Sequence, residues 1–288
     1  MKKSYVRYLN LALLIVLAIL ILIFLYIFKL SDFNKPIPDA ITLPKEVQES
    51  IANLKPQKVL NVPILLYHYV EYVKDEGDTI RKSLNITPYM FEQEIKTLED
   101  DGYTFVTMSD LADALDDKNN LPSKPVILTF DDGYRDFYTD VFPILKKYQV
   151  KAVAYIVPNF LNKPNNMDTW MLKEIAKSGL VEIGAHTMNH AYLSDLPLER
   201  VKYEVEESKK YLEKNLGIPV TTFAYPNGTF DNQIIDVVKK AGFKTAVTTI
   251  NGIFAQDINR FFLYRIRPGA RTGQSLLNLL DNPDAIKY

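Results

Sequence analysis

Two adjacent acidic residues in the middle of the chain are the first indication of a catalytic site. The apolar run Val126–Phe130 leads directly into Asp131, Asp132 and Gly133. An apolar run of this length predicts a buried strand, and side chains at adjacent positions leaving a strand point in different directions. One carboxylate can then face a substrate water while the other reaches a metal ion. An ordinary β-turn also favours Asp-Asp-Gly, so the segment needs support from elsewhere in the chain.

The three histidines of the chain supply that support. His186 and His190 follow a predicted strand, Val181–Ala185, and His68 follows another, Pro63–Tyr67. A spacing of four places two imidazoles on one side of a single turn, where they can bind one cation. Two imidazoles and a carboxylate make a three-ligand set with positions left open for water and substrate, as a hydrolytic Zn²⁺ centre requires.

The elements that position these residues follow a repeating pattern after residue 61. Short apolar runs alternate with amphipathic segments, which is typical of βα units. We expect strands at residues 63–67, 104–107, 126–130, 152–157, 181–185, 221–224, 245–248 and 263–266. We expect helices at residues 88–101, 109–116, 138–148, 169–178, 198–216 and 232–241. This α/β pattern predicts a distorted or incomplete (β/α) barrel, in which the C-terminal ends of the strands form the active face.

Composition excludes several other classes of protein. The 34 basic and 35 acidic residues are interspersed and give a net charge of −1, so nucleic acid is not an expected partner. The chain has no cysteine, which rules out disulfides and thiolate ligands. No glycine-rich phosphate loop follows a predicted strand, so a nucleotide-binding sheet has no support.

The N-terminal residues predict a membrane anchor. An apolar run from Leu9 to Phe28 follows Lys2, Lys3 and Arg7, and about 20 helical residues span a bilayer. The run ends in bulky residues without a small-residue cleavage site, which favours one retained transmembrane helix. The basic flank predicts a cytoplasmic N-terminus and a catalytic domain outside the cell membrane.

Four regions follow from this pattern. We expect a cytoplasmic stub and anchor at residues 1–29, and an extracytoplasmic linker at 30–61 with a weak helical stretch near residues 45–54. A catalytic domain at 62–275 and a C-terminal tail at 276–288 complete the chain. Prolines distributed among polar residues are typical of such a linker.

Two motifs of this chain resemble those of the polysaccharide deacetylase family, the NodB-homology domain of carbohydrate esterase family 4. The family motif TFDD matches Thr129-Phe130-Asp131-Asp132, and the motif H-[ST]-x-x-H matches the segment from His186 to His190. The resemblance extends over roughly residues 62–271. It implies that Asp131 is the general base and that Asp132, His186 and His190 bind a divalent metal. Zn²⁺ suits these ligands, although Co²⁺, Ni²⁺ or Mn²⁺ can occupy similar sites.

Two further segments resemble family motifs less closely. Ala224-Tyr225-Pro226-Asn227-Gly228 stands where family members usually have R-x-P-P-Y, which implies that the backbone N–H at Asn227 helps hold the oxyanion and that Tyr225 belongs to the same substrate or oxyanion site. On sequence alone, an ordinary turn is the better interpretation of Tyr-Pro-Asn-Gly. Tyr264-Arg265-Ile266 resembles the arginine motif, which implies that Arg265 orients Asp131 and lowers its pKa.

The chain departs from the family at its C-terminal end. Many members carry an L-x-H motif whose histidine protonates the leaving amine, but no histidine follows Arg271 here. His68 is the remaining candidate acid, with an expected pKa near the ordinary value of about 6.5. Its Tyr-His pair resembles the subgroup that deacetylates poly-N-acetylglucosamine.

The resemblance therefore implies a metal-dependent enzyme that removes N-acetyl groups from a polysaccharide of the cell envelope or biofilm. Poly-N-acetylglucosamine is the favoured substrate. Peptidoglycan, chitin oligomers or an O-acetylated glycan remain alternatives with the same chemistry. An anchored glycan-binding protein without activity is a different alternative, and it predicts the loss of Asp131 or of a metal ligand.

Overall fold

The computed structural model describes residues 43–52, 59–75, 77–256 and 259–282, which all belong to one compact unit. Within these ranges no helix is long and apolar enough to cross a bilayer. The predicted membrane anchor, Leu9 to Phe28, lies outside the described residues.

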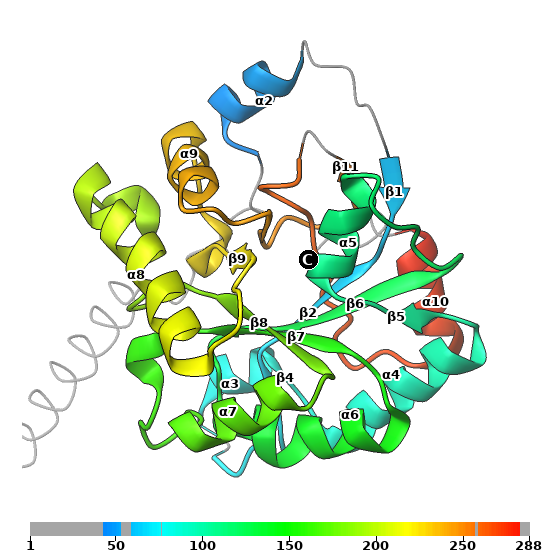
Figure 1. Ribbon diagram of the computed structural model, residues 1–288. Coiled ribbons are helices and arrows are strands. Elements are labelled where there is room, and N and C mark those ends of the chain that lie inside the picture. The colour runs from blue at the N-terminus through cyan, green and yellow to red at the C-terminus, as the bar shows by residue number, and fades with distance from the viewer. Residues whose placement is uncertain (1–42, 53–58, 76, 257–258, 283–288) are drawn as a thin grey trace, which may run out of the picture. The chain divides into compact units, whose positions relative to one another are not determined.

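A curled parallel sheet forms the centre of this unit (Figure 1). Its strands follow the order β10-β9-β8-β7-β6-β2, and β5 also pairs with β6. The strands are β2 (Ile64–Tyr67), β5 (Thr104–Phe105), β6 (Pro125–Phe130), β7 (Ala152–Ile156), β8 (Val181–Ala185), β9 (Thr222–Ala224) and β10 (Thr245–Val247). Every pairing between them is parallel, so these seven predicted strands are confirmed.

The eighth predicted strand, residues 263–266, forms isolated bridges instead of a ladder. Leu263 pairs with Val247 of β10, and Ile266 pairs with Leu65 of β2, both in parallel. The segment therefore connects the two edge strands of the sheet. This arrangement is consistent with the distorted (β/α) barrel that the sequence predicts.

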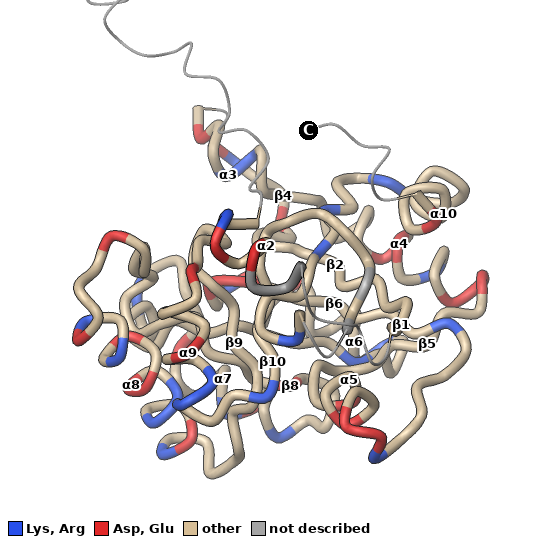
Figure 2. Tube along the Cα trace, turned by 90° about the horizontal axis from the view of Figure 1, so that it is seen from above, with Lys and Arg blue, Asp and Glu red and all other residues tan. Residues whose placement is uncertain are grey.

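Helices surround the sheet and carry charged residues of both signs (Figures 1 and 2). They include α4 (Pro88–Asp100), α5 (Met108–Leu115), α7 (Thr169–Lys177), α8 (Leu198–Leu216) and α9 (Asn232–Lys240). The predicted helix at 138–148 is divided into the π-helical segment η1 (Phe137–Val141) and α6 (Phe142–Tyr148). Short 3-10 turns follow three strands as η2 (Pro158–Phe160), η3 (Leu193–Asp195) and η4 (Pro226–Gly228).

Several elements at the edges of the unit go beyond the sequence prediction. These are α3 (Thr79–Ser83), α10 (Gly273–Asp281), the antiparallel pair β1 (Val59–Asn61) with β11 (Phe254–Gln256), and the parallel pair β3 (Tyr69–Val70) with β4 (Asn85–Ile86). Within the predicted linker, α2 (Lys45–Ala52) buries Val47 in the core. Leu276, Leu279 and Leu280 of α10 are buried, so the predicted tail at 276–288 begins inside a packed helix.

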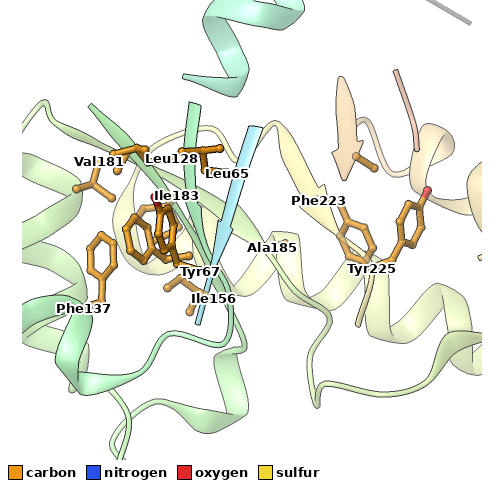
Figure 3. Close-up of a cluster of buried hydrophobic side chains, with 14 of the residues drawn as sticks. Leu65, Tyr67, Leu128, Phe137, Ile156, Val181, Ile183, Ala185, Phe223 and Tyr225 are labelled. Carbon is orange, nitrogen blue, oxygen red and sulfur yellow. The ribbon is translucent and has the colours of Figure 1, made fainter. Parts of the chain in front are cut away.

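The strands pack through two apolar layers. Outward side chains such as Leu65, Leu128 and Ile183 pack against the surrounding helices (Figure 3). Inward side chains, Ile64 and Ile127 among them, pack with α5 in a second cluster. Because side chains alternate along a strand, the residue after an outward-facing strand end must face inward. That rule decides where the polar residues at the strand ends lie.

Candidate active site

The inward positions at the C-terminal strand ends bring the predicted site residues together. Tyr67, Phe130 and Ala185 end β2, β6 and β8 and belong to the outer apolar cluster. The next residues, His68, Asp131 and His186, therefore turn towards the interior of the curled sheet. Tyr67 lies opposite Phe130 in the parallel register, which makes His68 and Asp131 neighbours. The structure thus gathers at one end of the sheet the residues that the motifs indicate.

Arg265 and Asp131 form a buried ion pair with two contacts. Arg265 Nη1 donates to Asp131 Oδ1 at 2.8 Å, and Nη2 donates to Oδ2 at 2.7 Å. The guanidinium also donates to Thr129 Oγ1 at 3.1 Å and, through Nε, to the carbonyl of Thr248 at 2.7 Å. Both charged side chains are almost fully buried, with 2% and 3% of Arg265 and Asp131 exposed.

This ion pair determines the protonation of Asp131. Burial raises the pKa of Asp131, but the adjacent charge of Arg265 and its hydrogen bonds outweigh burial and hold the pKa well below its ordinary value. Asp131 is therefore a carboxylate at neutral pH. A general base must be in this form to accept a proton.

Asp132, His186 and His190 form a compact group of three residues whose side chains can bind a metal ion. Asp132 Oδ1 lies 3.4 Å from His186 Nε2 and 3.2 Å from His190 Nε2. Ligands bound tetrahedrally at about 2.0–2.1 Å are separated by about 3.3 Å, so these distances fit a single cation. Asp132 Oδ1 is also buried without a hydrogen-bond partner among the described residues.

The backbone and the neighbouring carbonyl group orient the two imidazoles. His186 Nδ1 lies 2.7 Å from the carbonyl oxygen of Ala224, which assigns the proton to Nδ1 and leaves Nε2 free to bind a metal. Asp132 and His190 have left-handed backbones, with φ of 75° and 57°. Such conformations cost of order 1–3 kcal/mol in non-glycine residues and concentrate at functional sites.

The pKa of His68 differs from the expected value. Burial lowers its pKa to about 4, although the charges of Asp131 and Asp132 act in the opposite direction. The predicted value near 6.5 was therefore wrong for the free site. His68 is a neutral imidazole at neutral pH, and it must first gain a proton before it can protonate a leaving group.

Tyr225 does not face the site, contrary to the expectation. Alternation along β9 directs Tyr225 into the outer apolar cluster with Phe223 (Figure 3). There its ring stacks on Phe230. Its hydroxyl donates to the carbonyl of Phe261 at 2.8 Å. Its backbone N–H donates to the carbonyl of Val247 at 3.1 Å. Tyr225 is a core residue with no free donor for a substrate.

Asn227 occupies a different environment in the same turn. Its backbone is left-handed, with φ of 56°, and its side-chain Nδ2 is buried without a hydrogen-bond partner among the described residues. An unsatisfied buried donor is uncommon and calls for an explanation. An oxyanion or a glycan oxygen would satisfy this amide.

The sequence analysis missed an aromatic pair next to the metal-ligand group. Tyr69 and Tyr134 stack with ring centroids 3.9 Å apart, and Arg81 covers Tyr69 at 4.5 Å. Tyr134 is two residues from Asp132 in the chain. Its position directly after Asp-Asp-Gly was a usable signal, because a residue this close in the chain to a predicted metal ligand lies near the same strand end.

Comparisons with known proteins point to one family. Residues 118–246 match the profile of the family described as polysaccharide deacetylase. YxkH of Bacillus subtilis, which is named as a polysaccharide deacetylase, is 30% identical over 237 residues, covering 82% of each chain. The chain belongs to the polysaccharide deacetylase family. It is an enzyme of that family, and the predicted family resemblance is confirmed.

Two other relatives extend the comparison. The poly-β-1,6-N-acetyl-D-glucosamine N-deacetylase of Staphylococcus aureus is 29% identical over 198 residues, covering 64% of this chain and 68% of the relative. The structure of the Streptococcus pyogenes deacetylase PplD, in complex with acetate, superposes with a TM-score of 0.72 at 30% identity. That alignment covers 78% of this chain and 99% of PplD.

Proposed function

We propose that this polysaccharide deacetylase is a metal-dependent hydrolase that removes N-acetyl groups from poly-N-acetylglucosamine. The observation that carries the proposal is the group of Asp132, His186 and His190 beside the Asp131–Arg265 ion pair. One part of the site suits a cation and the other holds an ionised base. Their combination matches the hydrolysis of an acetamide.

The residues present fit a divalent cation. Asp132 Oδ1 is an unsatisfied buried oxygen between two imidazole Nε2 atoms, and a nitrogen-and-oxygen ligand set of this kind suits Zn²⁺, with Co²⁺, Ni²⁺ or Mn²⁺ as alternatives. Asp132, His186 and His190 would hold the ion. When bound, the ion would supply Lewis-acid chemistry by polarising the acetyl carbonyl and acidifying water.

Asp131 would act as the general base. It accepts a proton from the attacking water at a carboxylate oxygen, while Arg265 keeps the carboxylate oriented and ionised. The side-chain amide of Asn227 is available to donate to the oxygen that gains negative charge. Hydroxide addition and loss of the sugar amine then give acetate.

His68 would carry the proton to the leaving amine. It is neutral in the free site because burial lowers its pKa to about 4. The proton that Asp131 removes from water can pass to His68 and from there to the amine nitrogen. The proton count balances, because water supplies one hydroxide to the acetyl carbon and one proton to the amine.

Poly-N-acetylglucosamine is favoured over other N-acetylated glycans by one relative and one sequence feature. The Staphylococcus aureus relative bears the name of a poly-β-1,6-N-acetyl-D-glucosamine N-deacetylase, and the Tyr67-His68 pair resembles that subgroup. Peptidoglycan and chitin oligomers, or an O-acetylated glycan, are the alternatives that the same chemistry would accept.

Acetate release by the purified full-length chain tests the proposal. The assay compares β-1,6-linked N-acetylglucosamine oligomers with chitin oligomers, peptidoglycan and an O-acetylated glycan, with and without added Zn²⁺. We expect the fastest release from the β-1,6-linked oligomers and none from Asp131→Asn. Faster release from another polymer would identify that polymer, instead of poly-N-acetylglucosamine, as the substrate. Full activity after complete metal removal would contradict metal dependence.

We also propose that the enzyme is anchored in the cell membrane by residues 9–28, with the catalytic domain outside the cytoplasm. The apolar run and its basic N-terminal flank support this arrangement. Fractionation and protease treatment of intact cells test it. Recovery of the chain in the soluble fraction, or protection of the catalytic domain from external protease, would refute it.

A further inference from the structure

A buried carboxylate outside the catalytic group holds the residue that precedes the predicted ligand His190. Glu204 lies on α8 and is 1% exposed. Its Oε2 accepts from the backbone N–H of Asn189 at 2.9 Å, and its Oε1 accepts from Asn189 Nδ2 at 2.7 Å. One carboxylate thus binds Asn189 at two points.

The loop that Glu204 holds has an unfavourable backbone. Thr187 and His190 both adopt left-handed conformations, with φ of 60° and 57°. Non-glycine residues keep such conformations only where surrounding contacts enforce them. The Glu204 contacts fall on Asn189, between these two residues, so they act where the backbone most needs a constraint.

The amide of Asn189 is held from its other side as well. Asn159, in η2 after β7, donates from Nδ2 to Asn189 Oδ1 at 2.6 Å, and its backbone N–H donates to the carbonyl of Met188 at 3.2 Å. Asn189 therefore connects α8 to the loop after β7. Rotation of this residue would move His190, whose Nε2 must stay close to Asp132 Oδ1.

We infer that Glu204, acting through Asn189, is a positioning residue that sets the direction of His190 and thereby the metal affinity of the site. The inference rests on the proposed function, because it assumes that His190 binds a cation. Residues that orient metal ligands change affinity by about 10–100-fold when they are altered. A purely structural role would lower the stability of the metal-free protein and leave affinity unchanged.

A polarity exchange tests this role in the full-length chain. Glu204→Gln keeps a carbonyl oxygen that can accept from the Asn189 backbone N–H. Its amide NH2 group, however, then faces the amide NH2 group of Asn189, and two donors cannot bond to each other. We therefore expect Zn²⁺ affinity to fall about 10–100-fold. Asn189→Asp places two carboxylates against each other and should weaken affinity similarly. The double variant restores the bond in the opposite direction, from the amide introduced on α8 to the carboxylate introduced in the loop, and should recover most of the affinity.

The measurement is the Zn²⁺ dissociation constant, obtained by competition with a chromophoric chelator, beside the thermal midpoint of the metal-free protein. Ser208→Ala is the matched control, because Ser208 is buried on the same helix and its hydroxyl, among the described residues, bonds only to the backbone carbonyl of Val205. Wild-type affinity in Glu204→Gln, or a double variant that regains stability without affinity, would overturn the inference. Failure of the wild-type chain to bind Zn²⁺ or any other divalent cation would instead refute the proposed function.

Discussion

Arg265 contacts both carboxylate oxygens of Asp131, and the chain segment that carries it also joins the two edges of the sheet. Leu263 pairs with β10 and Ile266 pairs with β2. Arg265 lies between these two paired residues in the chain, and its side chain extends into the interior of the sheet. The 2.8 and 2.7 Å contacts with Asp131 depend on this closure. The closure of the sheet and the ionisation of Asp131 therefore depend on the same chain segment.

Replacing Arg265 by Met should shift the acid limb of the pH–rate profile upwards. Arg265 holds the pKa of Asp131 below its ordinary value, whereas burial alone raises it. Without the guanidinium, burial dominates, so Asp131 loses its proton only at higher pH. We expect kcat/KM to fall about 10²–10⁴-fold at neutral pH and to recover partly as pH rises. The profile of kcat/KM against pH measures this shift.

The same variant should lose stability. Removing one partner of a buried ion pair costs about 3–5 kcal/mol. Arg260→Met is a suitable control, because Arg260 forms a partly buried ion pair with a different carboxylate, Asp116, at 2.8 Å, so the substitution should change neither activity nor its pH dependence. An unchanged acid limb in Arg265→Met would show that Arg265 does not control the pKa of Asp131.

Metal removal should both inactivate the enzyme and destabilise it. A ligand that binds only the folded state stabilises it by about 2.7 kcal/mol at 100 times its dissociation constant. We therefore expect a chelator to lower the thermal midpoint of the wild type, and to have no such effect on His190→Ala. Calorimetry with and without chelator measures this difference. Chelator presaturated with Zn²⁺ serves as the control, and an equal drop with that reagent would count against a bound metal.

The sequence predicted correctly that Asp131, Asp132, His186 and His190 lie close together, because their motifs are local and their directions follow from strand alternation. Asp131 and His186 each come one residue after an outward-facing strand end, so their inward direction could be predicted. Arg265 required the resemblance to a family motif, since its partner is 134 residues away in the chain.

The errors arose where a side chain's direction or environment depends on distant elements. The Tyr-Pro-Asn-Gly turn suggested a substrate contact for Tyr225, but β9 directs the ring into the core, where Phe261 supplies its acceptor. The pKa of His68 depends on burial by the assembled site. The sequence contains one indication that Glu204 is buried and important. It is a charged residue on the apolar face of α8, between Val201 and Ser208.

Replacing His68 by Gln tests whether His68 transfers the proton to the leaving amine. If His68 relays the proton to the amine, kcat should fall by about 10²–10⁴-fold, with a smaller change in KM. Acetate release under saturating substrate measures the effect. Wild-type kcat in this variant would exclude His68 from proton transfer.

His68 should also make stability depend on pH. Its pKa is about 4 in the folded protein and about 6.5 when unfolded. Between these values the unfolded state binds the extra proton, so stability falls as pH decreases from 6.5 to 4, by at most about 1.4 kcal/mol per pH unit. Urea unfolding of the metal-free protein should show a shallower dependence in His68→Gln than in the wild type.

Replacing Glu94 by Gln should stabilise the protein at neutral pH. Glu94 on α4 is fully buried and accepts from the hydroxyl of Tyr67 at 2.8 Å. Burial raises its pKa well above the ordinary value, so the unfolded chain releases this proton at lower pH than the folded chain. Below about pH 4.3 the carboxyl is protonated in both states and its contribution to the free energy of unfolding is at its maximum. As pH rises towards the folded pKa, the unfolded chain loses this proton while the folded chain keeps it, so that contribution declines.

Gln cannot titrate, so its contribution does not decline with pH. We expect Glu94→Gln to be more stable than the wild type at pH 7.5 by about 1 kcal/mol or more, since each unit of pKa difference corresponds to about 1.4 kcal/mol. At pH 4 the difference should disappear or reverse, because the wild-type carboxyl is then protonated in both states. Urea unfolding at the two pH values measures this, and an equal stability difference at both would show that Glu94 stays ionised in the folded protein.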